Sequence, residues 1–365
     1  MKRMMNIAAA ALLGAVAGCS DTPAAKPQIA PRVADSSALA IRMNPAAVKD
    51  FSEAYASAVN SASGEGSKEL KTAQDALAAA GFGFNDLKWY TMSVGNLRKV
   101  ETPKDMPGVT VAVASAKPVD PEGFVNTCLG LMGEDECARM KESIKAEPFA
   151  AEGVKGWKIV ILDEDVELPP VSVAVVDGNV LVATIGDASI DGAIATLRTG
   201  AGTEKGTFNR IAAQAENVVW GALIPNVGAQ AVALMGDNLD AMCGNFPDGT
   251  PMGPFIKGLG EFSLEVASSE TALTLNARLA TASDADATRI KTLFDMFFMM
   301  VKGSAAESFS GDDAQSKLAK AAIESLSLAA EGPALSLTVS VPRDIAKEAL
   351  AKGYAESLSA AGILK

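Results

Sequence analysis

The residues best suited to metal chemistry in this sequence form a short acidic run, Asp163-Glu164-Asp165-Val166-Glu167. Several carboxylates on one short loop are what a hard cation such as Ca²⁺ prefers. The calcium loop of an EF-hand also needs glycine at its sixth position and glutamate at its twelfth, whereas a leucine and two prolines follow this run. We therefore interpret the run as a solvated acidic turn ahead of a strand, and we assign no metal ligand.

Cys128, Cys137 and Cys243 are the candidates for disulfide or thiol chemistry in the body of the chain. On one continuous helix, residues nine apart lie ~13.5 Å apart along the axis and on opposite faces, too far to bond. Gly130 and Gly133 lie between the first two, and the acidic residues 134–136 are typical of a second helix start. The pattern predicts a helix-turn-helix closed by a Cys128–Cys137 disulfide, with buried free thiols as the alternative. Cys243 has no histidine to act as its base, so we expect it to be buried or inert.

Histidine is absent from all 365 residues, which excludes many common catalytic centres. Ser-His-Asp and Cys-His nucleophiles, His-ligated zinc and His-bound haem all need an imidazole. The glycine-rich stretch 200–207 follows a predicted helix and has its lysine before the last glycine, the reverse of a phosphate loop. We interpret it as a helix C-cap and linker. We expect no catalytic residue and no cofactor, although carboxylate pairs are too numerous to rule out a hydrolase.

The composition and net charge of the chain indicate which classes of partner it can bind. Apolar residues make up 48% of the chain and charged residues 21%, so a sizeable core is expected. Acidic residues outnumber basic ones by 44 to 32, which gives a formal charge of −12. Because an acidic chain without a basic cluster repels phosphate backbones, we expect no nucleic-acid partner.

The stretch from Leu293 to Val301, LFDMFFMMV, has eight apolar residues among nine. A helix there is hydrophobic nearly all round, whereas a surface helix buries only one stripe. Five residues fill the expected buried stripe: Ile290, Leu293, Phe294, Phe297 and Val301. Four more form a surplus, a candidate apolar binding surface: Met296, Phe298, Met299 and Met300. We favour a helix sandwiched within the core over a lipid or partner groove, and both interpretations predict that these side chains are covered.

The N-terminal residues have the pattern of an export signal. Two positive residues, Lys2 and Arg3, precede an apolar run from Ile7 to Ala17 that is too short to span a bilayer. The end of this run, Val16-Ala17-Gly18-Cys19, resembles the lipobox of bacterial lipoproteins. The resemblance implies cleavage before Cys19 and acylation of its thiol and amine. Two or three acyl chains are enough for stable anchoring, so the mature protein is expected to be tethered to a membrane.

The signal-like N-terminus and the lipobox resemblance, taken with the rest of the sequence, predict four segments and a cellular location. They are a signal peptide (1–18), a proline-containing flexible tether (19–36) and two α+β units (37–208 and 209–365). Ser20 follows the expected lipidated cysteine. In enterobacterial lipoproteins a serine at this position directs sorting to the outer membrane, so we favour the outer membrane over the inner one. We expect a periplasm-facing protein of the cell envelope.

Alternating and β-branched runs predict a largely antiparallel sheet with helices packed on it, an α+β fold. Hairpins are expected at Asp177-Gly178-Asn179 and around residues 268–270. The predicted strands are 38–43, 87–94, 109–115, 157–162, 171–176, 179–185, 217–224, 261–268, 271–280, 323–330 and 334–341. Helices are expected after Asn44-Pro45, Asp120-Pro121, Asp187, Ser283 and Pro342.

The order of these elements repeats. Strand, helix, two strands, helix, strands and helix describe both 37–200 and 217–360, and residues 109–131 align with 275–297. We interpret the chain as a diverged tandem of two units, although many α+β chains can be divided in this way. The layout resembles uncharacterised bacterial envelope proteins with repeated strand-cap-helix units, and that resemblance implies no function.

From these patterns we expect a non-catalytic, lipid-anchored envelope protein that binds a protein partner or an apolar ligand. One alternative is a lipid or lipoprotein carrier with an internal apolar cavity. The other is a carboxylate-based hydrolase, which would need two acidic side chains in a cleft beside aromatic platforms. Trp89, Trp157 and Trp220 are the tryptophans available for such a platform.

Overall fold

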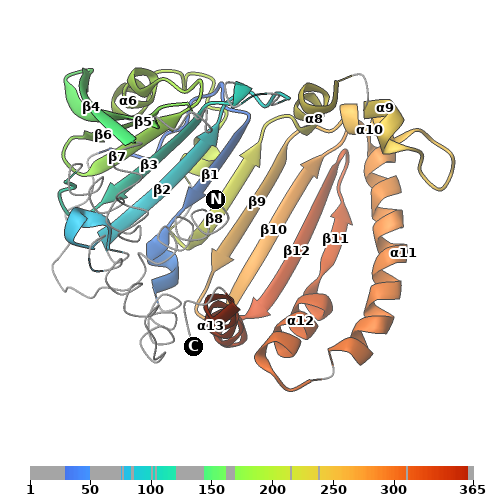
Figure 1. Cartoon of the computed structure of the whole chain (residues 1–365). Coiled ribbons are helices and arrows are strands. Elements are labelled where there is room, and N and C mark those ends of the chain that lie inside the picture. Colours follow the sequence, from blue (N-terminus) through green and yellow to red (C-terminus); the bar gives the residue numbers. More distant parts are fainter. Residues whose placement is uncertain are drawn as a thin grey trace.

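A computed structural model of the chain describes residues 29–49, 75, 78–83, 86–99, 102, 105–120, 144–161, 169–213, 216–236, 239–309 and 311–360. Within these residues the fold is α+β, as predicted, with one antiparallel twelve-stranded sheet that runs through the whole molecule (Figure 1). The strand order is β11-β12-β10-β9-β8-β1-β2-β3-β7-β6-β5-β4. The strands are β1 (Leu39–Met43), β2 (Leu87–Val94), β3 (Val109–Ser115), β4 (Ile144–Ala151), β5 (Val154–Ile161), β6 (Val171–Val176), β7 (Val180–Ile185), β8 (Val218–Ile224), β9 (Phe262–Ser268), β10 (Ala272–Ala280), β11 (Ser327–Ala330) and β12 (Ala334–Pro342).

Each predicted run overlaps a strand, although β5 begins three residues before its run, and both predicted hairpins are confirmed as the β6–β7 and β9–β10 pairs. Residues 323–325, assigned to a strand, instead end a helix. The helical elements are η1 (Pro45–Val48), η2 (Ala78–Phe82), α6 (Ile190–Thr199), α7 (Asn209–Ala212), α8 (Val227–Met235), α9 (Leu239–Cys243), α10 (Met252–Lys257), α11 (Asp284–Ser308), α12 (Ala314–Ser325) and α13 (Arg343–Ala360).

The N-cap of helix α6 lies two residues later than predicted. Ser189, not Asp187, is the N-cap, and its hydroxyl accepts a hydrogen bond from the Gly192 N–H. The helix ends at Gly200, whose φ of 79° is left-handed, as expected for a glycine C-cap. The helices predicted after Asn44-Pro45 and Asp120-Pro121 lie outside the described residues, apart from the short turn η1.

The sheet is buried on both faces in the first half of the chain. Successive residues of β3, Ala112, Val113 and Ala114, are all buried although they point to opposite faces. Two buried clusters lie on these faces: one includes Ile194 and Leu197 of α6, the other Phe82 of η2. Because both faces of the sheet are buried here, this half contains the main packed core of the described residues.

From β9 onward the sheet is covered differently. Paired positions such as Val266, Leu275 and Val339 place apolar residues on one face, while the alternate positions, such as Asn276 and Thr338, are polar. The apolar members are only half-buried in most cases, and the buried clusters of the described residues contain no residue beyond Leu223 of β8. This half therefore has an incompletely covered apolar face.

Residues 29–36 are docked on the body, so the prediction that they form part of a flexible tether is wrong. Ile29 and Val33 are buried in two of the apolar clusters. Arg32 donates to the Leu197 carbonyl (3.0 Å), and the Asp35 carboxylate accepts the backbone N–H of Lys205. These contacts tie this arm, residues 29–37, to the last turn of α6 and to the loop that follows it.

The two predicted units contribute to one continuous sheet, joined where β1 pairs with β8. Outward from this junction the strand orders are β1-β2-β3-β7-β6 and β8-β9-β10-β12-β11. In the first unit the β6–β7 hairpin pairs through β7 with β3, which is the third strand from the junction. In the second unit the β11–β12 hairpin pairs through β12 with β10, again the third strand from the junction. The origin of this arrangement by duplication stays a prediction.

Candidate functional site

Large exposed hydrophobic side chains gather in one half of the molecule. Within the described residues, all of them fall between 232 and 350: Val232, Leu234, Met235, Met242, Met296, Phe297, Met299, Met300, Phe309 and Leu350. Exposed apolar residues scattered singly are ordinary, but a contiguous group indicates a binding surface. The densest group belongs to α11.

We name Met296, Phe297, Met299 and Met300 the Met–Phe face. Their exposed fractions are 49%, 62%, 69% and 68%. At about 100° per residue these four positions fall within an arc of roughly 160° around the helix. None of these side chains offers a strong hydrogen-bond donor or acceptor. The Met–Phe face is thus a polarisable apolar strip, and thioether side chains let such a strip adapt to different shapes.

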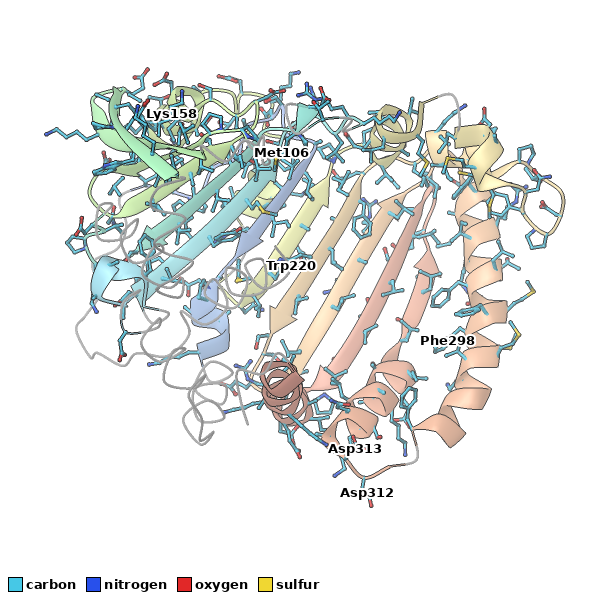
Figure 2. The ribbon with its side chains drawn as sticks, in the orientation of Figure 1. Met106, Lys158, Trp220, Phe298, Asp312 and Asp313 are labelled. Atoms are coloured by element: carbon cyan, nitrogen blue, oxygen red, sulfur yellow. The ribbon has the colours of Figure 1, made fainter. Side chains whose placement is uncertain are left out.

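The opposite side of α11 faces the sheet. Phe298 lies on the side of the helix toward β11 (Figure 2), is half-buried, and stacks on Phe294 with ring centroids 5.7 Å apart. The predicted buried stripe therefore contains one wrong residue, because Phe297 is exposed and Phe298 takes its place. The expectation that Met296, Met299 and Met300 are sandwiched in the core is also wrong.

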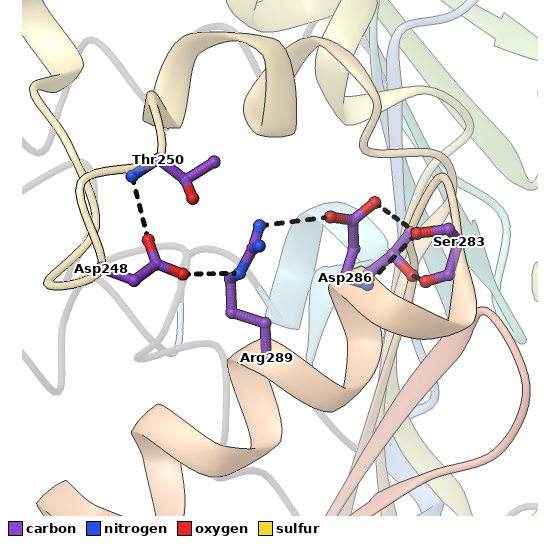
Figure 3. Close-up of polar contacts among 6 residues, drawn as sticks. Asp248, Thr250, Ser283, Asp286 and Arg289 are labelled. Atoms are coloured by element: carbon purple, nitrogen blue, oxygen red, sulfur yellow. Dashed lines mark hydrogen bonds and ion pairs between the residues drawn. The ribbon is translucent and has the colours of Figure 1, made fainter.

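Contacts at the first turns of α11 set the rotation of the helix. Its N-cap is the predicted Ser283, whose hydroxyl accepts the Asp286 backbone N–H (3.2 Å) and donates to the Asp286 carboxylate (2.7 Å). Arg289 lies between Asp248 (3.4 Å) and Asp286 (3.9 Å), as Figure 3 shows. These contacts join the loop between α9 and α10 to the start of α11.

The same loop shields the first turns of α11 on the side that carries the Met–Phe face. Arg289 is one heptad before Met296 and so lies on nearly the same side of the helix. Its guanidinium is 5.5 Å from the centre of the Phe246 ring, a cation–π contact. The Thr250 backbone N–H, donating to Asp248, is the main cause that lowers the pKa of this carboxyl below its usual 3.8. The Asp248 carboxylate therefore stays charged opposite Arg289.

The other predicted site residues are distributed as follows. Cys19, Cys128, Cys137 and residues 163–167 lie outside the described residues, so their predicted roles are untested. Cys243, at the end of α9, is a half-buried free thiol. In the described ranges no three Cys, Asp or Glu side chains come close enough to hold a metal, and no helix there combines the length and hydropathy needed to cross a bilayer.

The tryptophans of the hydrolase alternative do not form one platform. Trp89 is buried in a core cluster of the first half and exposes only 4% of its surface. Trp157 and Trp220 are half-buried on β5 and β8, which are separated by five other strands. A large aromatic surface for a sugar ring therefore has no basis in these three residues.

Comparisons with known proteins give distant structural similarity only. No family model matches the chain, and no curated protein matches its sequence. Three crystal forms of TP0453 are similar: form III has a TM-score of 0.41 at 9% identity and covers 89% of this chain and 96% of that one. Form I (0.35, 8%) and form IV (0.37, 10%) each cover 87% of this chain and 93% of theirs. TM-scores below 0.5 do not establish a shared fold, so the functional inference rests on this chain's own residues.

Proposed function

We propose that this protein is a lipid-anchored, non-catalytic component of the bacterial cell envelope that binds an apolar ligand through its second half. The lipobox-like sequence ending at Cys19 supports the anchor, the periplasm-facing location and, with Ser20, the outer membrane. The observation that carries the binding function is the Met–Phe face, which leaves four large apolar side chains in solvent. Such exposure is unfavourable unless a ligand or partner covers it.

The chemistry of the face favours an apolar small molecule, such as one bearing acyl chains, over a protein partner. A protein interface has about one hydrogen bond per 100–200 Å², whereas Met296, Phe297, Met299 and Met300 present only methyl, methylene, thioether and ring groups. The chain's formal charge of −12 also opposes a docked acidic protein or anionic membrane. A molecule without hydrogen-bonding needs matches this strip best.

A titration with the uncharged fluorescent probe N-phenyl-1-naphthylamine tests the proposal. The chain from Ser20 onward keeps every described residue and avoids detergent, which would compete for the probe. We expect saturable binding that falls at least tenfold in the Met299→Gln/Met300→Gln variant, because glutamine has a similar helix propensity but a polar end. Leu350→Gln, an exposed position on α13, is the matched control.

The unfolding midpoint of each variant must stay near that of the parent, so that lost binding is not lost folding. Saturable binding that persists in the double variant would place the apolar site away from α11. Absence of saturable binding in the parent chain would reject the apolar ligand and leave a protein partner as the occupant of the Met–Phe face. The carrier alternative needs an internal cavity, whereas this apolar strip lies on the outside of α11.

A further inference from the structure

A cleft of about 390 Å³ lies in the first half, away from α11. It is formed by the docked arm (residues 29–37), β2, β3 and the flank of α6. This volume falls within the range of sites that hold small molecules. Small residues keep it open: Ala112 on β3 and Gly192 and Ala193 on α6 face it where larger side chains would fill the space.

Two residues that line the cleft carry hydroxyl groups and expose little of their surface as a whole. Thr91 on β2 exposes 4% of its surface and Ser37 on the arm exposes 9%. Among the described residues, neither hydroxyl has a hydrogen-bond partner. By contrast, the hydroxyl of Thr196, on the α6 side, donates to the Ala201 carbonyl (2.8 Å) and is satisfied. The hydroxyls of Thr91 and Ser37, which line the cleft and can each donate and accept, are therefore available to a polar molecule inside it.

The charged groups of the cleft favour an anion. Arg32 uses one guanidinium nitrogen to donate to the Leu197 carbonyl (3.0 Å), which leaves further N–H groups for a ligand. At the other end Arg98 pairs with Asp187 (2.5 Å), so that these two charges offset each other. The net charge of the lining is therefore +1, a local reversal in a chain whose formal charge is −12.

We infer that this cleft binds a small hydroxylated organic anion of the sugar-acid class. The guanidinium of Arg32 would receive the carboxylate, since arginine presents paired donors to carboxylates. The hydroxyls of Thr91 and Ser37 would exchange hydrogen bonds with hydroxyls of the ligand, because each can donate and accept. This site is independent of the Met–Phe face and of the proposed apolar ligand.

Calorimetric titration of the full chain in detergent with three probes tests the inference. Sodium gluconate carries both the charge and the hydroxyls, glucose only hydroxyls, and acetate only the charge. We expect gluconate to bind at one site per chain and at least tenfold more tightly than either of the others. Arg32→Gln should weaken gluconate binding at least tenfold, and the isosteric Thr91→Val should weaken it several-fold.

Arg210→Gln is the control, because Arg210 pairs with Glu261 outside this cleft. Ser37→Ala serves as a second test of the hydroxyls if the Thr91 variant does not fold. No heat with gluconate would overturn the inference, as would equal binding of gluconate and glucose. Unchanged gluconate affinity in the Arg32 variant would also overturn it, whatever the outcome at the Met–Phe face.

Discussion

Adjacent phenylalanines on α11 provide a matched test of how this helix is rotated. Phe297 is 62% exposed, whereas Phe298 is half-buried and stacked on Phe294. Truncation of a core phenylalanine to alanine costs ~3–5 kcal/mol, and an aromatic pair adds ~0.5–1.5 kcal/mol beyond burial. For the partly covered Phe298 we expect a loss of about 2 kcal/mol in the free energy of unfolding. For Phe297→Ala the expected change is within ~0.5 kcal/mol, as at other surface positions.

Both substitutions replace phenylalanine by alanine in the same helix, so both gain the same helix propensity. This gain cancels when the free energies of unfolding of the two variants are compared. Urea unfolding followed by circular dichroism should place the midpoint of Phe298→Ala about 0.5 M or more below that of Phe297→Ala. Phe297→Ala should instead weaken binding of the hydrophobic probe at unchanged stability. Equal destabilisation by both substitutions would refute the assigned rotation, and a larger loss at Phe297 would restore the stripe predicted from sequence.

Three further outcomes are expected. Cys19→Ser should release the protein from membranes or block its processing, and unchanged partitioning into a detergent phase would contradict lipidation. Gly228→Ala should cost ~1–3 kcal/mol, because its new Cβ would lie 2.3 Å from a backbone carbonyl oxygen, whereas Gly353→Ala on α13 meets nothing within 4 Å and should be neutral or stabilising. Because the pKa of Asp248 is lowered by the Thr250 N–H, its stabilising effect is present above pH 3.8 and is lost as the pH falls through its folded pKa. Asp248→Asn should flatten the loss of stability below pH 4, and an unchanged pH profile would count against this contact.

The strands of this protein could be predicted well because most of them alternate or carry β-branched residues. The strand that sequence reasoning missed, β4, contains Lys145, Glu147 and Pro148. It lies at the edge of the sheet, where one side needs no partner, and β4 there tolerates a proline that a central strand would exclude. Charged residues and proline on such an edge also discourage pairing with another chain. Its sequence therefore indicates a loop unless its position in the sheet is known.

The docked arm illustrates a second limit of sequence reasoning. Its proline and polar residues are typical of a linker, and its large apolar side chains, Ile29 and Val33, are too few to show a period. What holds the arm is a set of contacts with residues more than 160 positions away, such as the Arg32 bond to Leu197. Pairings of that kind depend on the closed fold, so no local pattern could indicate them.

The rotation of α11 has the same origin and bears directly on function. Sequence periodicity orients a helix only when one side is apolar and the other polar, and between Leu293 and Val301 both sides are apolar. The orientation is fixed instead by polar contacts two turns earlier, where Arg289 is held by Asp248 and Asp286. These contacts direct Phe298 toward β11 and leave Met299 in solvent. A protein that needed α11 only as a structural support could have placed lysine or glutamate on its outer side at little cost in stability. The presence of three methionines and a phenylalanine there is therefore better explained by the proposed covered surface than by packing within the chain.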